Sequence, residues 1–267
     1  MPAPTARPGS GSRFTVVVTR PGPKAKALVE GLTALGAEVI PYPVMEIRPP
    51  ANPAPLDAAC ARIATYDVVL FTSVNGVQAV AERVAAWPAP GPRVAVVGEQ
   101  TAKAVRRRGW PVDYQPEAAH AAGLLGILTA SRPVAGLRCL FPRAAQGREV
   151  LVDGLRAAGA AVDLVTAYRA VAVEHTPEET RATLSGRTID LVTFTSGACA
   201  DHFLDRMAEA DLAATARGWP AAVIGPVTRD ACMGHGLRVV AMAKQPNSEA
   251  FLHAICAHLR AAPPRPR

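Results

Sequence analysis

The stretch VVLFTSVNGV (residues 68–77) joins a run of β-forming residues to a segment with helical character. Its first half is continuously apolar, which is typical of a strand buried on both faces of a sheet. Thr72, Ser73 and Asn75 follow where this strand gives way to a helix. Such side chains can cap the backbone N–H groups of the first helical turn, or the N–H groups can bind an anion. The stretch alone leaves both interpretations open.

The same pattern, a β-forming run followed by Thr-Ser, occurs again at IDLVTFTS (residues 189–196). It is part of a repeat that covers most of the chain. LVEGLTALGAEV at 28–39 matches LVDGLRAAGAAV at 151–162, and the same spacing pairs Arg20 with Arg143. So many matching blocks in the same order indicate an internal duplication.

A second pair of blocks follows with a slightly larger spacing. VVGEQTAKAVRRRGWPV at 96–112 matches VIGPVTRDACMGHGLRV at 223–239. This match pairs glycines and threonines that come directly after apolar runs, namely Gly98 with Gly225 and Thr101 with Thr228.

Each half alternates β-rich runs with helical patterns. TVVVT at 15–19 precedes a helix with an apolar stripe that closes at Gly36, a residue type suited to helix ends. A short strand and a long helix are expected before residue 67, and a further strand at 112–114. Apolar strands alternating with helices predict an α/β fold of two doubly wound, flavodoxin-like parallel sheets, with a binding cleft between the halves.

The amino-acid composition limits the classes of protein and of ligand that are expected. The 267 residues are 49% hydrophobic and 19% charged, as in soluble globular proteins, and no apolar run is long enough to cross a bilayer. Five cysteines without a CxxC pair, and a start that lacks a signal-peptide core, predict a cytoplasmic protein. The net charge of +7 favours anionic ligands. Because the sequence has no recognisable nucleic-acid-binding motif and only 5% aromatic residues, we expect no nucleic acid partner.

Ligands of parallel sheets bind beyond the carboxyl ends of the strands, and the polar loops of both halves fall there. No loop carries a GxGxxG or GxxxxGK[ST] motif, so neither a dinucleotide nor a nucleoside triphosphate is expected. His253 and Cys256 share a helical face, whereas His258 lies off it, so a metal site is not expected either. The remaining histidines are scattered and assemble no catalytic triad.

The ordered motifs resemble one known family. TRP at 19–21, YDVVLFTSVNGV at 66–77, VAVVGEQTAKAV at 94–105, LVTAY at 164–168 and DLVTFTS at 190–196 are similar to uroporphyrinogen-III synthases, over roughly residues 14–259. The resemblance implies a cytoplasmic hydro-lyase of haem biosynthesis, which closes linear hydroxymethylbilane into uroporphyrinogen III with loss of water and inversion of the last pyrrole ring. It implies no metal or organic cofactor. From the lack of a long apolar run we expect no membrane partner, and we also expect a monomer. A non-catalytic tetrapyrrole-binding regulatory module of the same fold is the alternative.

The resemblance also implies site residues. Tyr168 matches the active-site tyrosine of the family, where it would donate a proton to the leaving hydroxyl or position it; a structural tyrosine is the alternative. The residues expected to bind the carboxylates of the substrate are Arg20, Ser73, Asn75, Gly76, Gly98, Thr101, Arg143, Ser196, Gly197, Gly225 and Thr228.

The family's domain arrangement differs from a simple division into halves. Carried over, it predicts domain one at 13–39 with 173–259 and domain two at 50–164. Two linker strands at 40–49 and 165–172 would join them. A disordered lead (1–12) and tail (260–267) complete the prediction.

Overall fold

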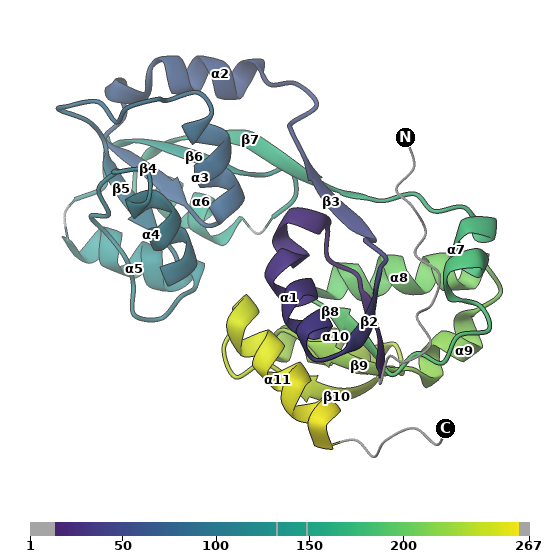
Figure 1. Cartoon of the computed structure of the whole chain (residues 1–267). Coiled ribbons are helices and arrows are strands. Elements are labelled where there is room, and N and C mark those ends of the chain that lie inside the picture. The colour runs from purple at the N-terminus through teal and green to yellow at the C-terminus, as the bar shows by residue number, and fades with distance from the viewer. Residues whose placement is uncertain (1–13, 132, 148, 262–267) are drawn as a thin grey trace. The chain divides into compact units, whose positions relative to one another are not determined.

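The computed structural model describes residues 14–131, 133–147 and 149–261, and the chain forms two compact units (Figure 1). Unit 1 comprises Met1–Glu46 with Val171–Arg267, and unit 2 comprises Ile47–Ala170. Both boundaries lie inside the predicted linkers, but β7 (Ala161–Ala172) continues unbroken past the predicted domain end at residue 164. The predicted lead lies outside the described residues.

Unit 1 is built on a five-stranded sheet in the order β10-β9-β8-β1-β2, and its ladders are parallel. Its elements are β1 (Phe14–Val18), α1 (Gly22–Ala34), β2 (Ala37–Pro41), α7 (Pro177–Leu184), β8 (Leu191–Phe194), α8 (Gly197–Glu209), α9 (Ala213–Gly218), β9 (Pro220–Val223), α10 (Pro226–Gly234), β10 (Arg238–Met242) and α11 (Ser248–Ala261). The last helix therefore runs two residues into the predicted tail, whose remaining residues lie outside the described chain.

Both faces of this sheet are covered, as continuously apolar strands require. Val17 of β1 packs with residues of α8, whereas its neighbours Val16 and Val18 pack with α1 and α11 on the other face. The predicted end of the first helix is confirmed, because Gly36 follows α1 with a φ of 77° that suits glycine.

Unit 2 holds the second five-stranded sheet, in the order β3-β7-β6-β4-β5. Its elements are β3 (Met45–Arg48), which spans the unit boundary, α2 (Ala54–Ala61), the 3-10 turn η1 (Ile63–Thr65), β4 (Val68–Phe71), α3 (Val74–Ala81), β5 (Arg93–Val96), α4 (Glu99–Arg106), α5 (Ala121–Ser131), β6 (Arg138–Ala144), α6 (Val150–Ala157) and β7. The ladders joining β4 to β5 and β6, and β6 to β7, are parallel. The predicted α/β fold with parallel sheets is confirmed.

The opening stretch shows the same two-sided burial. Val69 and Phe71 of β4 pack with α2, α3 and α4, whereas Val68 and Leu70 pack with α5 and α6. Consecutive strand residues point to opposite faces, so an all-apolar strand needs both layers of helices.

Two expected elements are shorter than predicted. The strand at 112–114 is reduced to one parallel bridge between Ala95 and Tyr114. The long helix expected before residue 67 is the eight-residue α2. It ends at Ala61 because Arg62 leaves helical geometry, and η1 follows. Apolar periodicity indicated that these elements exist but did not fix where their hydrogen bonding stops.

Candidate functional site

Ser73 stands at the carboxyl end of β4 and caps α3. Its backbone is extended, and its Oγ accepts a hydrogen bond from the Gly76 N–H at 3.1 Å. The Tyr168 hydroxyl donates a second hydrogen bond to the same oxygen at 3.0 Å. A serine hydroxyl can accept two hydrogen bonds and donate one. The helix-cap interpretation of Ser73 is therefore correct, and the residue also retains a proton that it can donate.

A bulge in the ladder between β6 and β7 aims Tyr168 at Ser73. Arg143 pairs with Thr166 and Ala144 with Tyr168, so Ala167 is an extra residue on β7. Ala167 and Tyr168 consequently both pack against the core cluster around α3, although neighbours in a regular strand point to opposite faces. The Tyr168 carbonyl accepts from the Ala145 N–H at 2.9 Å, which fixes the bulge.

A hollow of about 240 Å³ lies beside this pair within unit 2. Its lining is Thr72, Ser73, Ala121, Phe141, Arg143, Ala144, Gln146, Gly147, Leu151 and Tyr168. We call it the Tyr168 pocket. Three of the predicted site residues, Ser73, Arg143 and Tyr168, are brought together here.

Arg143 supplies the positive charge of the Tyr168 pocket. Its side chain is only 11% exposed and forms an ion pair with Glu149, which precedes α6. The guanidinium lies 5.9 Å from the centre of the Phe141 ring, within the range of a cation–π contact. A guanidinium held in this way suits a carboxylate, which it can bind through two parallel N–H bonds.

Gly76 has a packing role at this site. A Cβ there would lie 2.9 Å from the Pro142 carbonyl oxygen, so glycine allows α3 to approach the backbone of β6. Its N–H is already bonded to Ser73. Asn75, in the same first turn, does not line the Tyr168 pocket.

The predicted residues around α4 lie at a different point of the unit 2 edge. Gly98 precedes α4, and no side chain caps this helix end. Thr101 is only 5% exposed, so its hydroxyl is hardly available to a ligand. Neither residue lines the Tyr168 pocket.

The matching edge of unit 1 carries its own predicted residues. Arg20 follows β1, and its Nη1 donates to the Ser248 Oγ at 3.1 Å, at the start of α11. Burial lowers the pKa of the Arg20 guanidinium from its usual value, because desolvation disfavours the charged form.

Ser196 differs from its sequence counterpart Ser73. It also caps a helix, accepting from the Cys199 N–H at 3.2 Å, but it donates its proton to the Cys199 Sγ at 3.2 Å. No tyrosine donates to Ser196 among the hydrogen bonds of the described residues. Two serines that look equivalent in sequence therefore present different groups.

Three further predicted residues stand at the helix starts of unit 1. Gly197 opens α8, and a Cβ there would lie 3.0 Å from the Ala231 Cβ, which indicates close packing. Gly225 precedes α10 in an extended conformation, and Thr228 within α10 is 5% exposed. At these positions, a ligand could contact backbone groups more readily than side chains.

Sequence reasoning missed Gln146, Glu149 and Ser248. Glu149 comes just before a helix, where acidic residues are common, and Ser248 begins one. These signals existed, but only the folded loops reveal that Glu149 meets Arg143 and Ser248 meets Arg20.

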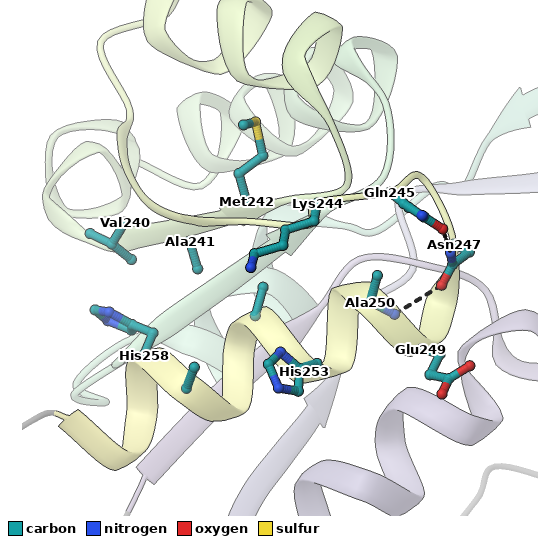
Figure 2. Close-up of a pocket in the computed structure, with 12 residues that line it drawn as sticks. Val240, Ala241, Met242, Lys244, Gln245, Asn247, Glu249, Ala250, His253 and His258 are labelled. Atoms are coloured by element: carbon teal, nitrogen blue, oxygen red, sulfur yellow. Dashed lines mark hydrogen bonds between the residues drawn. The ribbon is translucent and has the colours of Figure 1, made fainter.

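A larger hollow of about 820 Å³ lies between β10 and α11 of unit 1 (Figure 2). None of the predicted site residues lines it. Size therefore does not identify the site that the sequence predicts, and the chemistry of the lining residues must decide.

Two classes of site find no support in the described part of the chain. Across residues 14–131, 133–147 and 149–261, no three His, Cys, Asp or Glu side chains cluster so that they could hold a metal ion. No helix in these ranges is sufficiently long and apolar to span a membrane.

Sequence comparison matches the chain to one family. A family model described as uroporphyrinogen-III synthase HemD matches residues 26–253. The uroporphyrinogen-III synthase of Synechococcus elongatus is 34% identical over 249 residues, which cover 90% of this chain and 94% of that protein. A putative uroporphyrinogen-III synthase of Methanothermobacter thermautotrophicus is 30% identical over 84% of this chain and 91% of its own.

Solved structures share the fold. A crystal structure of a mutant uroporphyrinogen III synthase from Thermus thermophilus has a TM-score of 0.65 at 17% identity, and covers 93% of this chain and 100% of that chain. The uroporphyrinogen-III synthetase of Helicobacter pylori gives a TM-score of 0.60 at 18% identity, with 91% and 99% covered. The structural likeness supports the α/β fold independently of the sequence match.

Proposed function

Since the chain belongs to the uroporphyrinogen-III synthase family of cyclising lyases in haem biosynthesis, we propose that the Tyr168 pocket is where it closes hydroxymethylbilane. The product would be uroporphyrinogen III, formed with loss of water and inversion of the last pyrrole ring. The hydrogen bond from Tyr168 to Ser73 beside the half-buried Arg143 is the observation that carries this assignment. It supports the assignment because a hydroxyl that could donate a proton and a guanidinium that could bind a carboxylate line the same hollow.

Loss of the hydroxymethyl oxygen is the first chemical step. The C–O bond breaks, and the oxygen must accept a proton to leave as water. The Tyr168 O–H already points toward an acceptor, the Ser73 Oγ, and the oxygen of the substrate would replace that acceptor. Hydrogen-bond donation to the leaving oxygen stabilises the charge that develops as the bond breaks.

The cation left on the substrate must then be held in one conformation. The substituted α-carbon of the last ring attacks it to give a spiro intermediate, whose fragmentation and recombination invert that ring. Holding one folded conformation converts competing ring closures into a single favoured one. Catalysis would therefore depend on several weak contacts more than on one strong acid.

The enzyme would position the substrate by binding its carboxylates. In unit 2, Arg143 and Ser73 would bind these carboxylates. The ion pair between Arg143 and Glu149 would then break, or the guanidinium would contact both carboxylates. In unit 1, Arg20 and Ser196 would do so. The helix-start residues Asn75, Gly76, Gly98, Thr101, Gly197, Gly225 and Thr228 would contribute mainly through backbone N–H groups and close packing.

We also propose that the two units are duplicated flavodoxin-like domains. The sequence repeat matches β1 with β6, β2 with β7, β8 with β4 and β9 with β5. The orders β2-β1-β8-β9 and β7-β6-β4-β5 then coincide strand by strand, which supports the proposal. In unit 1 the complete order corresponds to 2-1-3-4-5, the flavodoxin-like arrangement. The enzyme would act in the cytoplasm as a monomer.

Turnover separates this proposal from a non-catalytic binding module. Purified protein with excess hydroxymethylbilane should form many molecules of uroporphyrinogen III per chain, as resolved by chromatography of the oxidised isomers. A regulatory module would bind uroporphyrinogen tightly and leave the product as the spontaneous, uninverted type I isomer. That second result would overturn the proposed function.

A further inference from the structure

The hollow between β10 and α11 plays no part in the proposed reaction, and its lining has a distinct chemistry. Alanine and valine side chains form much of its wall, together with Met242. Its basic lining residues are Lys244, His253 and His258 (Figure 2). Its volume of about 820 Å³ falls within the range of small-molecule sites.

The hollow exists because α11 turns small residues toward it. The helix packs on the sheet through Phe251, Ile255 and Leu259, which are buried. The adjoining stripe of the helix carries Ala250, Ala254 and Ala257, whose short side chains leave space beside the strand. The strand itself ends the sheet order, so no described strand covers its outer edge.

The basic side chains of the hollow have no polar partner within the described part of the chain. No described residue forms a hydrogen bond or an ion pair with the side chain of Lys244, His253 or His258, in contrast to the paired arginines elsewhere in the chain. Figure 2 shows the Lys244 side chain extending over the gap toward α11, with His258 near Val240 at one end. Glu249, the acidic lining residue, lies at the other end.

We propose that this hollow is a second binding site, for a small amphipathic anion with an acidic group on a flat apolar body. The acidic group would lie between Lys244 and His258, where the lysine ammonium attracts it and the imidazole can donate a hydrogen bond. The apolar body would cover the alanine stripe and Met242, which is 38% exposed without a ligand. The negative charge of Glu249 directs the acidic group to the opposite end of the hollow.

Fluorescence titration with 8-anilinonaphthalene-1-sulfonate tests the site on the full chain. This probe carries a sulfonate on an apolar body, and we expect saturable binding of one probe per chain. Lys244→Gln should weaken binding about three- to fivefold, as for the loss of one exposed charge pair. Ala257→Phe should weaken it at least about tenfold, because the ring fills the hollow at an exposed helix position.

Matched controls make the test specific. Arg217→Gln removes an exposed charge on α9 outside the hollow and should leave the affinity unchanged. The neutral analogue N-phenyl-1-naphthylamine should bind more weakly than the sulfonate and should not respond to Lys244→Gln. Circular dichroism verifies that each variant is folded, and turnover of hydroxymethylbilane should be unchanged in Ala257→Phe.

Three results would overturn the site. They are absence of saturable binding, probe affinity that neither Lys244→Gln nor Ala257→Phe changes, and a chain dimer in sedimentation that Ala257→Phe dissociates. The last result would make this face an interface between copies. Since none of these readouts uses the ring-closure reaction, failure here leaves the proposed function standing.

Discussion

Ser73 and Ser196 show how much a single residue depends on its neighbours. In sequence, both follow a buried strand and precede a helix, and both cap that helix in the structure. Ser73 accepts a hydrogen bond from the Tyr168 hydroxyl. Ser196 instead donates a hydrogen bond to the sulfur of the buried Cys199. The two serines therefore occupy equivalent positions but form different hydrogen bonds.

The role of Tyr168 gives the first prediction at this scale. Tyr168→Phe keeps the ring and removes the hydroxyl, so the turnover of hydroxymethylbilane should fall by about a hundredfold, the lower end of the range for a lost proton donor. Binding of uroporphyrinogen III should weaken less than fivefold, since the ring still fills the pocket. Steady-state kinetics and product titration measure the two effects separately.

Ser196→Ala is the matched comparison, because its hydroxyl bonds to a thiol instead of a tyrosine. It should reduce turnover less than Tyr168→Phe does. Unchanged turnover in Tyr168→Phe, with full formation of the type III isomer, would make Tyr168 a structural residue.

At the scale of the elements, helix α3 is held close to β6 by Gly76. An added Cβ would meet the Pro142 carbonyl oxygen at 2.9 Å, and a backbone atom cannot easily move aside. Gly76→Ala should therefore lower the free energy of unfolding by about 1–2 kcal/mol, because overpacking exceeds the gain in helix propensity.

The chain offers a matched control for this substitution in α5. Gly126 is exposed, and a Cβ there would meet nothing within 4 Å. Gly126→Ala should raise the free energy of unfolding by about 0.5–1 kcal/mol through helix propensity alone. Urea denaturation of both variants gives the comparison, and equal effects would contradict the close approach of α3 and β6.

A second element-scale contact ties the turn after α2 to β7. Asp163 accepts from the Tyr66 hydroxyl at 2.6 Å and from the Arg62 Nη2 at 3.0 Å. The Tyr66 hydrogen bond is the main cause that lowers the pKa of Asp163 below its usual value. A carboxyl whose pKa is lower in the folded state stabilises the fold above its unfolded pKa, and this contribution is lost as the pH falls through the folded value.

Asp163→Asn should therefore destabilise the protein at neutral pH by about 0.5–1 kcal/mol, a small value because the carboxylate is partly exposed. The difference from wild type should shrink as the pH falls below about 4, where the unfolded carboxyl becomes protonated. Urea denaturation at several pH values measures it, and Asp205→Asn on the exposed side of α8 should show no comparable change. A difference independent of pH would rule out the ionised carboxylate as its source.

The elements also show what the sequence could predict. Continuously apolar runs and the sequence repeat located strands such as β4 and β8, and the serine caps marked the starts of α3 and α8. The bulge at Ala167 carried no local signal, because it depends on how β7 pairs with β6. Without the bulge, regular alternation would point Tyr168 away from Ser73, so the site geometry could not be derived from pattern alone.

For the whole molecule, the proposed duplication would explain why each unit places polar groups at the carboxyl ends of its strands. Unit 2 has Tyr168, Ser73 and the half-buried Arg143 beside one hollow. Unit 1 retained a serine bound to a thiol and an arginine bound to Ser248. The proposed function would therefore assign the proton donor to unit 2.

The proportion of type III to type I isomer, measured as the protein concentration is raised, tests the central claim most directly. Hydroxymethylbilane closes spontaneously to type I, so an enzyme must compete with that background. The account predicts that the type III fraction rises with protein concentration until it dominates, and that Tyr168→Phe needs far more protein to reach the same fraction. A fraction that stays at the spontaneous value at every protein concentration would contradict it.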